Sequence, residues 1–378
     1  MNKTVIFISD FDTNGSGYSN IVESIGNHLS SKYNIIGLGI SYNRKMHDWL
    51  FSVSMCHPQF VPSAIASISS AIQGGVRDVF IFMDITFIEQ LANIIRKEQK
   101  IFKDIRLHGI FAVEADPLLQ SWAMSLMKLN SRFPISQFGE NICKLAGIKS
   151  KHIPIPINLN AWRLRTNDEH LQIKEALGFK DKYLFFMNGD GNERKNISAL
   201  YEAFKIVLEK EPKAHLMLLT RKNSPAGWRL DDLADQLEVT KNITVIDRGL
   251  NKEEVRKLYV AADIYIKPSK AEGCCLPILE AMAVGVPIVA TNCTALSEHI
   301  SDGRGVGMKP DYKWIDPFGN GHRYFVFPEN MSKYMLDEID KVRNGFDYTE
   351  QLVDARNYVE SRTVETATQL LIDEIEKE

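Results

Sequence analysis

Residues 265–290 read YIKPSKAEGCCLPILEAMAVGVPIVA, and this stretch decides the fold. The short apolar run at 264–266 predicts a strand, which the following proline ends. Pro277 suits the first position of a helix, because its missing N–H has no helical partner there. Gly285 suits the position just past the last helical turn, and an Ile-Val-Ala run then begins another strand. The order is strand, loop, helix, turn, strand.

The loop before this helix predicts an anion site. Backbone N–H groups at a helix start have no partner within the helix, and the positive end of the helix dipole lies behind them. Such a site suits a phosphate or a diphosphate. The residues in this position are Gly273, Cys274, Cys275 and Leu276.

Two carboxylates flank the anion site. Glu272 precedes the loop and Glu280 lies in the first turns of the helix. A carboxylate repels phosphate but accepts hydrogen bonds from sugar hydroxyls. The pair therefore indicates a ligand with a phosphate centre and a polyol at each end, which is the shape of a sugar nucleotide. For an isolated pair of acids, the plainer alternative is a solvated loop acid and a helix-terminal acid.

The surrounding pattern, P-S-x-x-E-G-x-x-L-P-x-x-E-A-M-A-x-G-x-P, closely resembles the E-x7-E signature of the retaining GT-B glycosyltransferases of the family-4 group. The resemblance implies that Glu272 faces the donor sugar and that Glu280 holds the nucleotide ribose. Cys275 is a departure, because the family usually has glycine there. A side chain at this position narrows the pocket or alters the backbone angle.

Composition is that of an ordinary soluble globular protein. The chain has 378 residues, which fits two domains or one large domain, and 44% of them are hydrophobic. The net charge of the chain is −3, so its overall charge does not indicate binding to a polyanion such as a nucleic acid. The five cysteines have no metal-ligand spacing, and the N-terminus lacks a secretory pattern, which favours reduced thiols in the cytoplasm. No apolar run is long enough to span a bilayer, so membrane association would be peripheral.

The first half begins with a buried-strand pattern at 5–8, a loop containing Gly15 and Gly17, and a helical pattern. Strand, glycine-rich turn and helix form the phosphate-approach unit of doubly wound folds. A third glycine at dinucleotide-fingerprint spacing is missing, which argues against a dehydrogenase. By resemblance, both glycines face the donor diphosphate and the acceptor.

His108 falls in the strand pattern 107–111, and we place it at a strand end. There it resembles the family histidine near the donor sugar, which would make it catalytic. A structural histidine is the equal alternative. Glu114 and Asp116 come shortly after this strand pattern. They are predicted to be either solvated loop acids or residues that contact the acceptor. Residues 152–158 are predicted to be the proline-containing strand that closes the first domain.

The second half repeats the strand–loop–helix order. Arg194 and Lys195 precede a helix after the strand pattern 183–187, where two cations would add to an anion site. This loop resembles the family's G-R-x-x-x-x-K-N loop, which implies that Lys195 contacts the diphosphate. Asp190 stands where the family has arginine, and Arg194 is the nearest cation to compensate.

Two further segments complete the second half. Arg248 and Gly249 follow the strand pattern 243–246, at the place where the family holds the nucleotide base. Residues 308–330 match no simple period and are predicted to be a loop.

Alternating strands and helices predict an α/β protein with parallel sheets. The resemblance specifies a GT-B fold, with two doubly wound, Rossmann-like parallel-sheet domains facing across a cleft. We expect an N-terminal acceptor-side domain over 1–165, a nucleotide-sugar donor domain over 166–356, and a C-terminal helix, 357–378, that packs back on the first domain.

The implied function is transfer of a sugar from a nucleoside diphosphate sugar, UDP- or GDP-linked, to an acceptor hydroxyl with retention of anomeric configuration. Glu272, Lys195 and His108 would be the catalytic residues, and neither a metal nor another cofactor is implied. Glycan, lipid, small-molecule and nucleic-acid acceptors all stay open.

Two alternatives belong to other classes of function. A GT-B-like sugar-nucleotide epimerase would bind the same donor and need no acceptor. A catalytically silent nucleotide-sugar-binding partner protein would fit the departures at Asp190 and Cys275.

Overall fold

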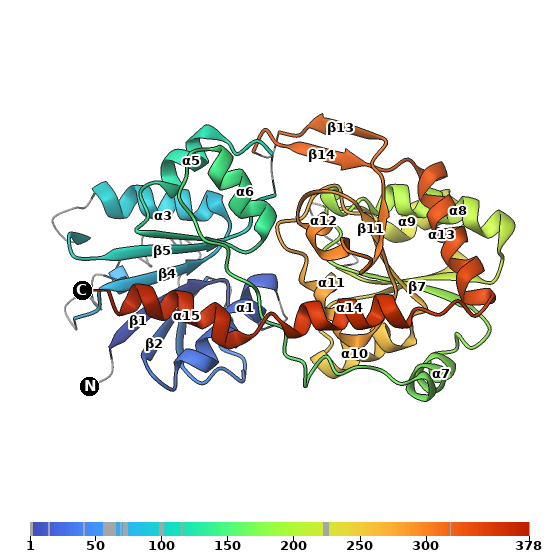
Figure 1. Ribbon diagram of the computed structural model, residues 1–378, viewed down its shortest axis with the longest axis horizontal. Coiled ribbons are helices and arrows are strands. Elements are labelled where there is room, and N and C mark those ends of the chain that lie inside the picture. Colours follow the sequence, from blue (N-terminus) through green and yellow to red (C-terminus); the bar gives the residue numbers. More distant parts are fainter. Residues whose placement is uncertain are drawn as a thin grey trace. The chain divides into compact units, whose positions relative to one another are not determined.

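The computed structural model of the protein describes residues 3–13, 16–40, 42–55, 66–68, 70, 75–97, 102–114, 116–221, 227–317 and 319–377 (Figure 1). The chain forms two compact units. The first contains Met1–Pro156, Pro317–Gly321 and Arg362–Glu378, and the second contains Ile157–Asp316 and His322–Ser361. Within the described ranges, every helix falls short of the length and apolarity that a membrane crossing needs.

The first unit is built on a six-stranded parallel sheet with the order β3-β2-β1-β4-β5-β6. Its strands β1, β4 and β5 are almost wholly buried, as expected for a parallel sheet covered on both faces. The strands are β1 (Thr4–Ser9), β2 (Asn34–Gly39), β3 (Ser52–Met55), β4 (Asp78–Phe82), β5 (Arg106–Phe111) and β6 (Ser131–Pro134).

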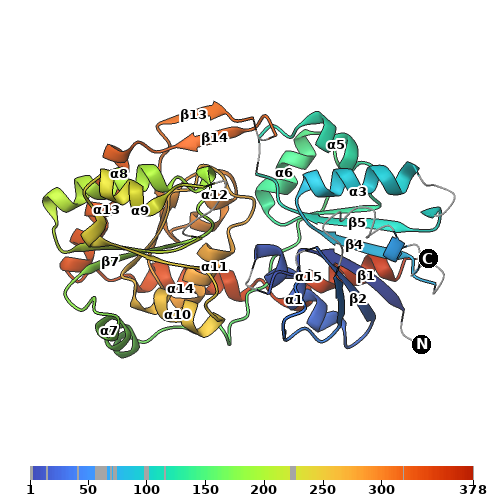
Figure 2. The ribbon, with the colours of Figure 1, turned by 180° about the vertical axis from the view of Figure 1, so that it is seen from behind.

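Helices cover both faces of this sheet, with α1 and α15 side by side on one face (Figures 1 and 2). The helices are α1 (Gly17–Leu29), α3 (Ile85–Lys97), α5 (Gln120–Leu126), α6 (Gln137–Leu145) and α15 (Val364–Ile375). The C-terminal helix thus belongs to the first unit. It begins after Thr363, whose side chain caps it by accepting a hydrogen bond from the Thr366 N–H.

The second unit repeats the plan, with a parallel sheet of order β12-β11-β10-β7-β8-β9. Its strands are β7 (Tyr183–Asn188), β8 (Ala214–Leu219), β9 (Ile243–Ile246), β10 (Ile264–Lys267), β11 (Ile288–Thr291) and β12 (Val306–Met308). Its helices are α7 (Asn167–Ala176), α8 (Ile197–Lys210), α9 (Leu230–Gln236), α10 (Lys252–Ala261), α11 (Leu276–Val284), α12 (Thr294–Ile300), α13 (Pro328–Arg343) and α14 (Thr349–Glu360), with 3-10 turns at Glu193–Lys195 (η1) and Thr240–Asn242 (η2). Both units are therefore doubly wound and Rossmann-like, as predicted.

The expected domain boundary differs from the observed one. The units divide between Pro156 and Ile157 rather than at 165/166, and residues 357–361 lie in the second unit rather than the first. The predicted strand at 152–158 is wrong. The Ile153 N–H donates to the Pro134 carbonyl of β6, but Pro154 and Pro156 have no N–H groups to continue a ladder.

The predicted loop at 308–330 is also wrong. It contains an antiparallel hairpin of β13 (Tyr312–Ile315) and β14 (His322–Phe325). All four residues of β13 are exposed, so the strand has no buried face to impose a period of two on the sequence.

Candidate functional site

The loop between β10 and α11 forms the centre of the candidate site. Helix α11 begins at Leu276. Pro277 is therefore its second residue, whereas the sequence predicted it to be the first. Cys275 is the N-cap and has left-handed backbone angles, φ 72° and ψ 65°. Gly285 ends the helix in the same region, φ 82°, as predicted. The positive φ explains why glycine suits position 275, because only glycine takes such angles without steric cost.

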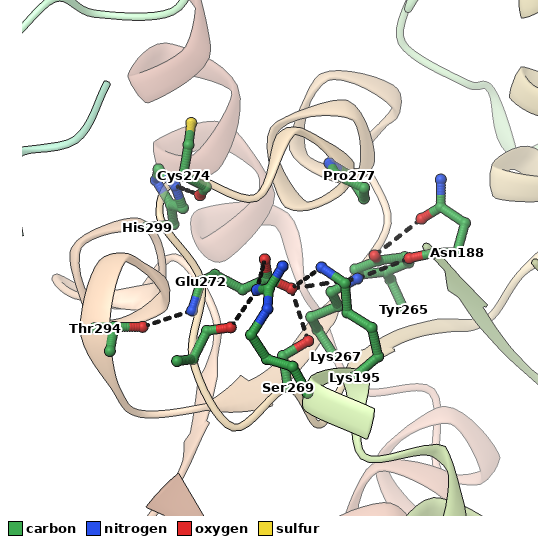
Figure 3. Close-up of polar contacts among 12 residues, drawn as sticks. Asn188, Lys195, Tyr265, Lys267, Ser269, Glu272, Cys274, Pro277, Thr294 and His299 are labelled. Carbon is green, nitrogen blue, oxygen red and sulfur yellow. Dashed lines mark hydrogen bonds and ion pairs between the residues drawn. The ribbon is translucent and has the colours of Figure 1, made fainter. Parts of the chain in front are cut away.

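Glu272 is buried in this loop, and several donors converge on its carboxylate (Figure 3). The Lys195 ammonium lies 2.6 Å from Oε1, and the Arg194 guanidinium lies 2.8 Å from Oε2. The Ser269 hydroxyl donates to Oε1 at 2.7 Å, and the Lys267 ammonium lies 3.7 Å away. Burial opposes ionisation of Glu272, but the charges of its cationic neighbours hold its pKa well below the usual range.

Lys195 and Arg194 come from η1, directly before α8. Burial, together with the neighbouring Arg194 charge, lowers the pKa of Lys195 to about 8 despite the nearby carboxylate. Gly189 precedes this turn with φ 145°, and a Cβ there would lie 2.9 Å from the Lys267 ammonium. Glycine therefore leaves room for Lys267, which donates to the Asn188 carbonyl at 2.7 Å.

Glu280 lies in the buried second turn of α11, and burial raises its pKa to about 7. The Tyr259 hydroxyl of α10 lies 2.8 Å from Glu280 Oε2 and 3.0 Å from Asn188 Oδ1. The Tyr265 hydroxyl lies 3.0 Å from the same Asn188 oxygen. These contacts hold the carboxyl group in place beside the end of β7.

The back of the loop is fixed by α12. A His299 ring nitrogen lies 2.5 Å from the Cys274 carbonyl, and the Thr294 hydroxyl accepts the Glu272 N–H at 2.9 Å. These two contacts hold the loop from Glu272 to Cys274 against α12 (Figure 3). Positive charge, backbone N–H groups and two carboxyl groups therefore meet at the carboxyl edge of one parallel sheet, where ligands of such sheets bind.

The remaining predicted donor residues lie after β9, in the first unit, or outside the described ranges. Arg248 and Gly249 directly follow β9, with Gly249 exposed at φ 110°. Asp190, at the family's arginine position, pairs with Arg221 at 3.5 Å. Gly17 is the first residue of α1 in the first unit, and Gly15 lies outside the described residues.

The predicted placement of His108 at a strand end is wrong. It is the third residue of β5, is fully buried, and lies 2.9 Å from the Asp78 carboxylate at the first residue of β4. Asp78 also holds Arg106 at 2.8 Å. His108 thus faces the amino-terminal edge of the sheet, opposite the edge where ligands of parallel sheets bind, and the hydrogen bond to Asp78 gives the buried ring a polar partner.

Sequence reasoning missed several side chains that shape the site, and four of them contact the acids or the end of β7 directly. They are Lys267, Ser269, Tyr259 and Thr294. Lys267 and Ser269 had a usable signal, because they are polar residues at the end of a buried strand beside Glu272. Tyr259 and Thr294 are distant in sequence from the acids they contact, so only the fold brings them there.

A comparison with protein families matches residues 169–315 to the family "Glycosyl transferases group 1". This region contains Lys195, Glu272 and Glu280. O-antigen chain mannosyltransferase B of Escherichia coli is 33% identical over 34% of this chain and 32% of its own length. D-inositol 3-phosphate glycosyltransferase of Corynebacterium efficiens is 30% identical over 47% of this chain and 38% of its own length. The chain thus spans well under half the length of these relatives.

Solved structures of other proteins share this fold over nearly the whole length of the chain. HepE of Anabaena in complex with UDP-glucose superimposes with a TM-score of 0.76, covering 98% of this chain and 99% of its own, at 13% identity. At that identity the likeness establishes the fold alone. It confirms the predicted GT-B architecture.

Proposed function

Residues 169–315 form a domain of the glycosyl transferases group 1 family, and from this premise we propose that the protein transfers a sugar from a nucleoside diphosphate sugar to an acceptor hydroxyl. One observation carries the proposal. Two cations, Lys195 and Arg194, a buried acid, Glu272, and the N-terminus of α11 lie together at one sheet edge. This combination suits a ligand with a diphosphate and a sugar.

The ion pairs indicate how the donor binds. Without ligand, Lys195 and Arg194 neutralise Glu272 at 2.6 and 2.8 Å. A diphosphate attracts the same cations more strongly, because it carries more charge than a carboxylate. We expect the donor to take these cations and leave Glu272 to accept hydrogen bonds from sugar hydroxyls. Glu280 would then accept the ribose hydroxyls.

The residues also supply what departure of the diphosphate needs. Negative charge grows on the diphosphate oxygen as its bond to the anomeric carbon breaks, and Lys195, Arg194 and the α11 N–H groups stabilise that charge. The acceptor oxygen bonds to the anomeric carbon, and its proton passes to the departing phosphate oxygen. The products are a glycoside and a nucleoside diphosphate. In this scheme protein groups supply the positive charge, so no metal is required. The anomeric configuration of the donor is retained in the product. The acceptor binds to the first unit.

The test is incubation with UDP- and GDP-sugars and a panel of hydroxyl acceptors, with nucleoside diphosphate release and glycoside formation both measured. NMR of the first-formed product should show the anomeric configuration of the donor. Inversion of that configuration would contradict the proposed course of the reaction. Sugar-nucleotide isomerisation with no acceptor would instead establish an epimerase, and tight nucleotide binding without turnover would establish a silent binding protein.

A further inference from the structure

We infer that Lys270 is a positioning residue through which the β13–β14 hairpin braces the two donor-site cations. The expected effect on nucleotide binding rests on the proposed function. The position of Lys270 rests on its contacts within the second unit. Lys270 lies two residues before Glu272 and itself faces away from the carboxylate, toward η1 and β14. It is 5% exposed, which is unusual for a lysine.

The backbone of Lys270 joins three segments. Its N–H donates to the Arg194 carbonyl at 2.9 Å, which ties the Glu272 loop to η1. Its carbonyl accepts the Tyr324 N–H at 2.9 Å, which ties the same loop to β14. The Cys293 thiol lies 3.6 Å from that carbonyl. A shift of the hairpin is therefore transmitted directly to the loop that carries Glu272.

The side chain of Lys270 joins the same segments a second time. Its ammonium forms an ion pair with Glu193, the first residue of η1, and lies 4.5 Å from the centre of the Phe325 ring in β14. Glu193, Arg194 and Lys195 make up the whole of η1. Because a three-residue turn has few hydrogen bonds of its own, an external anchor on Glu193 fixes the direction of the two cations that follow.

The neighbouring charges fit this arrangement. Asp316 and Arg323 of the hairpin segment lie 3.7 Å apart, and Arg323 is almost fully buried. Both charges act on the Lys270 ammonium: burial lowers the pKa of Lys270 to about 8, Asp316 opposes that shift, and Arg323 adds to it. The hairpin thus presents an aromatic ring and an ordered ion pair to the residue that holds η1.

The Lys270 contacts should strengthen donor binding by holding the two cations in place before the donor arrives. Lys195 and Arg194 bind a diphosphate best when both are already directed at it, because immobilising them on binding lowers the affinity. Loss of the Lys270 anchor should leave η1 more mobile and weaken diphosphate binding. The fold of the second unit should survive, since its apolar core lies elsewhere.

The experiment compares Lys270→Met, which keeps the apolar stem, with Lys313→Met, the same change at an exposed position of β13. Hydrogen exchange of peptides covering 190–197 is measured without ligand, and UDP and GDP affinities are measured by calorimetry. Lys270→Met should speed exchange in this segment and weaken nucleotide binding, each by about tenfold, while thermal unfolding changes little. Lys270→Arg should restore both properties, and Lys313→Met should alter neither.

Two results would overturn the inference. One is unchanged exchange at 190–197 in Lys270→Met, whether or not any nucleotide binds. The other is equal acceleration in Lys270→Met and Lys313→Met, which would mean a general loss of stability. If the wild-type protein bound neither nucleotide, the proposed function would fail, while the exchange comparison would still decide the positioning role.

Discussion

Lys195 is a buried ammonium group whose charge is available only over part of the pH range. Burial lowers its pKa to about 8, so its positive charge is lost as the pH rises through that value. The last phosphate proton leaves at about pH 6, so the charge of the diphosphate itself stays nearly constant there and does not oppose the effect of Lys195. We predict that nucleotide affinity falls as the pH rises from 7 to 9.5, by up to about tenfold per pH unit above 8. Calorimetric titration across this range measures it.

The control for this prediction is Lys195→Met, which has no charge to lose. Its affinity should be weaker than that of the wild type at pH 7 and nearly independent of pH. An equally steep decline in Lys195→Met would show that another group binds the diphosphate.

Glu280 gives a second pH effect, this time on stability. Burial raises its pKa from 4.5 to about 7, so between these values the folded protein holds a proton that the unfolded chain has lost. The free energy of unfolding therefore falls as the pH rises through this window. Glu280→Gln removes this dependence and should gain about 1–3 kcal/mol relative to the wild type between pH 5 and pH 8.

Urea denaturation of both proteins at several pH values measures that difference. Glu169→Gln is a suitable comparison, because Arg256 lowers rather than raises the pKa of Glu169. Between pH 5 and pH 8 its stability difference from wild type should stay nearly constant, because Glu169 is ionised there in both the folded and the unfolded state. A pH-independent difference for Glu280→Gln would mean that Glu280 stays ionised throughout.

At the scale of one element, the start of α11 holds a side chain in a conformation suited to glycine. Cys275 has φ 72°, at a cost of about 1–2 kcal/mol for a residue with a Cβ. Cys275→Gly relieves this strain while losing a buried thiol, so the free energy of unfolding should change by less than about 1 kcal/mol. Cys275→Val should cost more than about 2 kcal/mol, because a β-branched residue tolerates this region poorly.

Cys274 is the matched control, since it is equally buried but has no positive φ. Cys274→Gly gains no relief of strain and should cost more than Cys275→Gly in urea denaturation. Equal costs at the two positions would show that the left-handed conformation of Cys275 stores no strain.

Elements were predictable where local chemistry and the fold agree. The β10–α11–β11 unit follows from an apolar run, a proline near the helix start and Gly285 at its end. The hairpin was not predictable, because β13 is exposed on all four residues. The role of His108 was misplaced because Asp78, which pairs with it, lies thirty positions away in the sequence. The Lys195–Glu272 pair joins two loops in the same way, and only the motif indicated that they meet.

At the scale of the whole molecule, the last helix completes the first unit rather than the second. Leu371 and Ile375 of α15 are fully buried, and Glu376 pairs with Lys3 and accepts from Tyr33. Leu371→Ala should lower the stability of the first unit by about 2–5 kcal/mol. Hydrogen exchange should accelerate in α1 and β1 and stay unchanged in β7 and β10.

Gln369→Ala, an exposed change in the same helix, should alter exchange in neither unit. Faster exchange in β7 after Leu371→Ala would contradict the assignment of α15 to the first unit alone. The two-unit plan itself was predictable from the alternation of strands and helices. The position of the boundary was not, because the segment after Pro156 carries no local signal that separates one core from the other.

The most direct test of the central claim is a thermal-shift series with UDP, GDP, ADP and their sugars on the wild type, Glu280→Ala and Lys195→Met. One nucleotide at about a hundred times its dissociation constant should stabilise the wild type by roughly 2.7 kcal/mol, and both substitutions should weaken that shift. Lys210→Met, an exposed change at the end of α8, should leave it intact. Absence of a shift with every nucleotide, or a shift that both substitutions leave unchanged, would contradict a donor site at Lys195, Glu272 and Glu280.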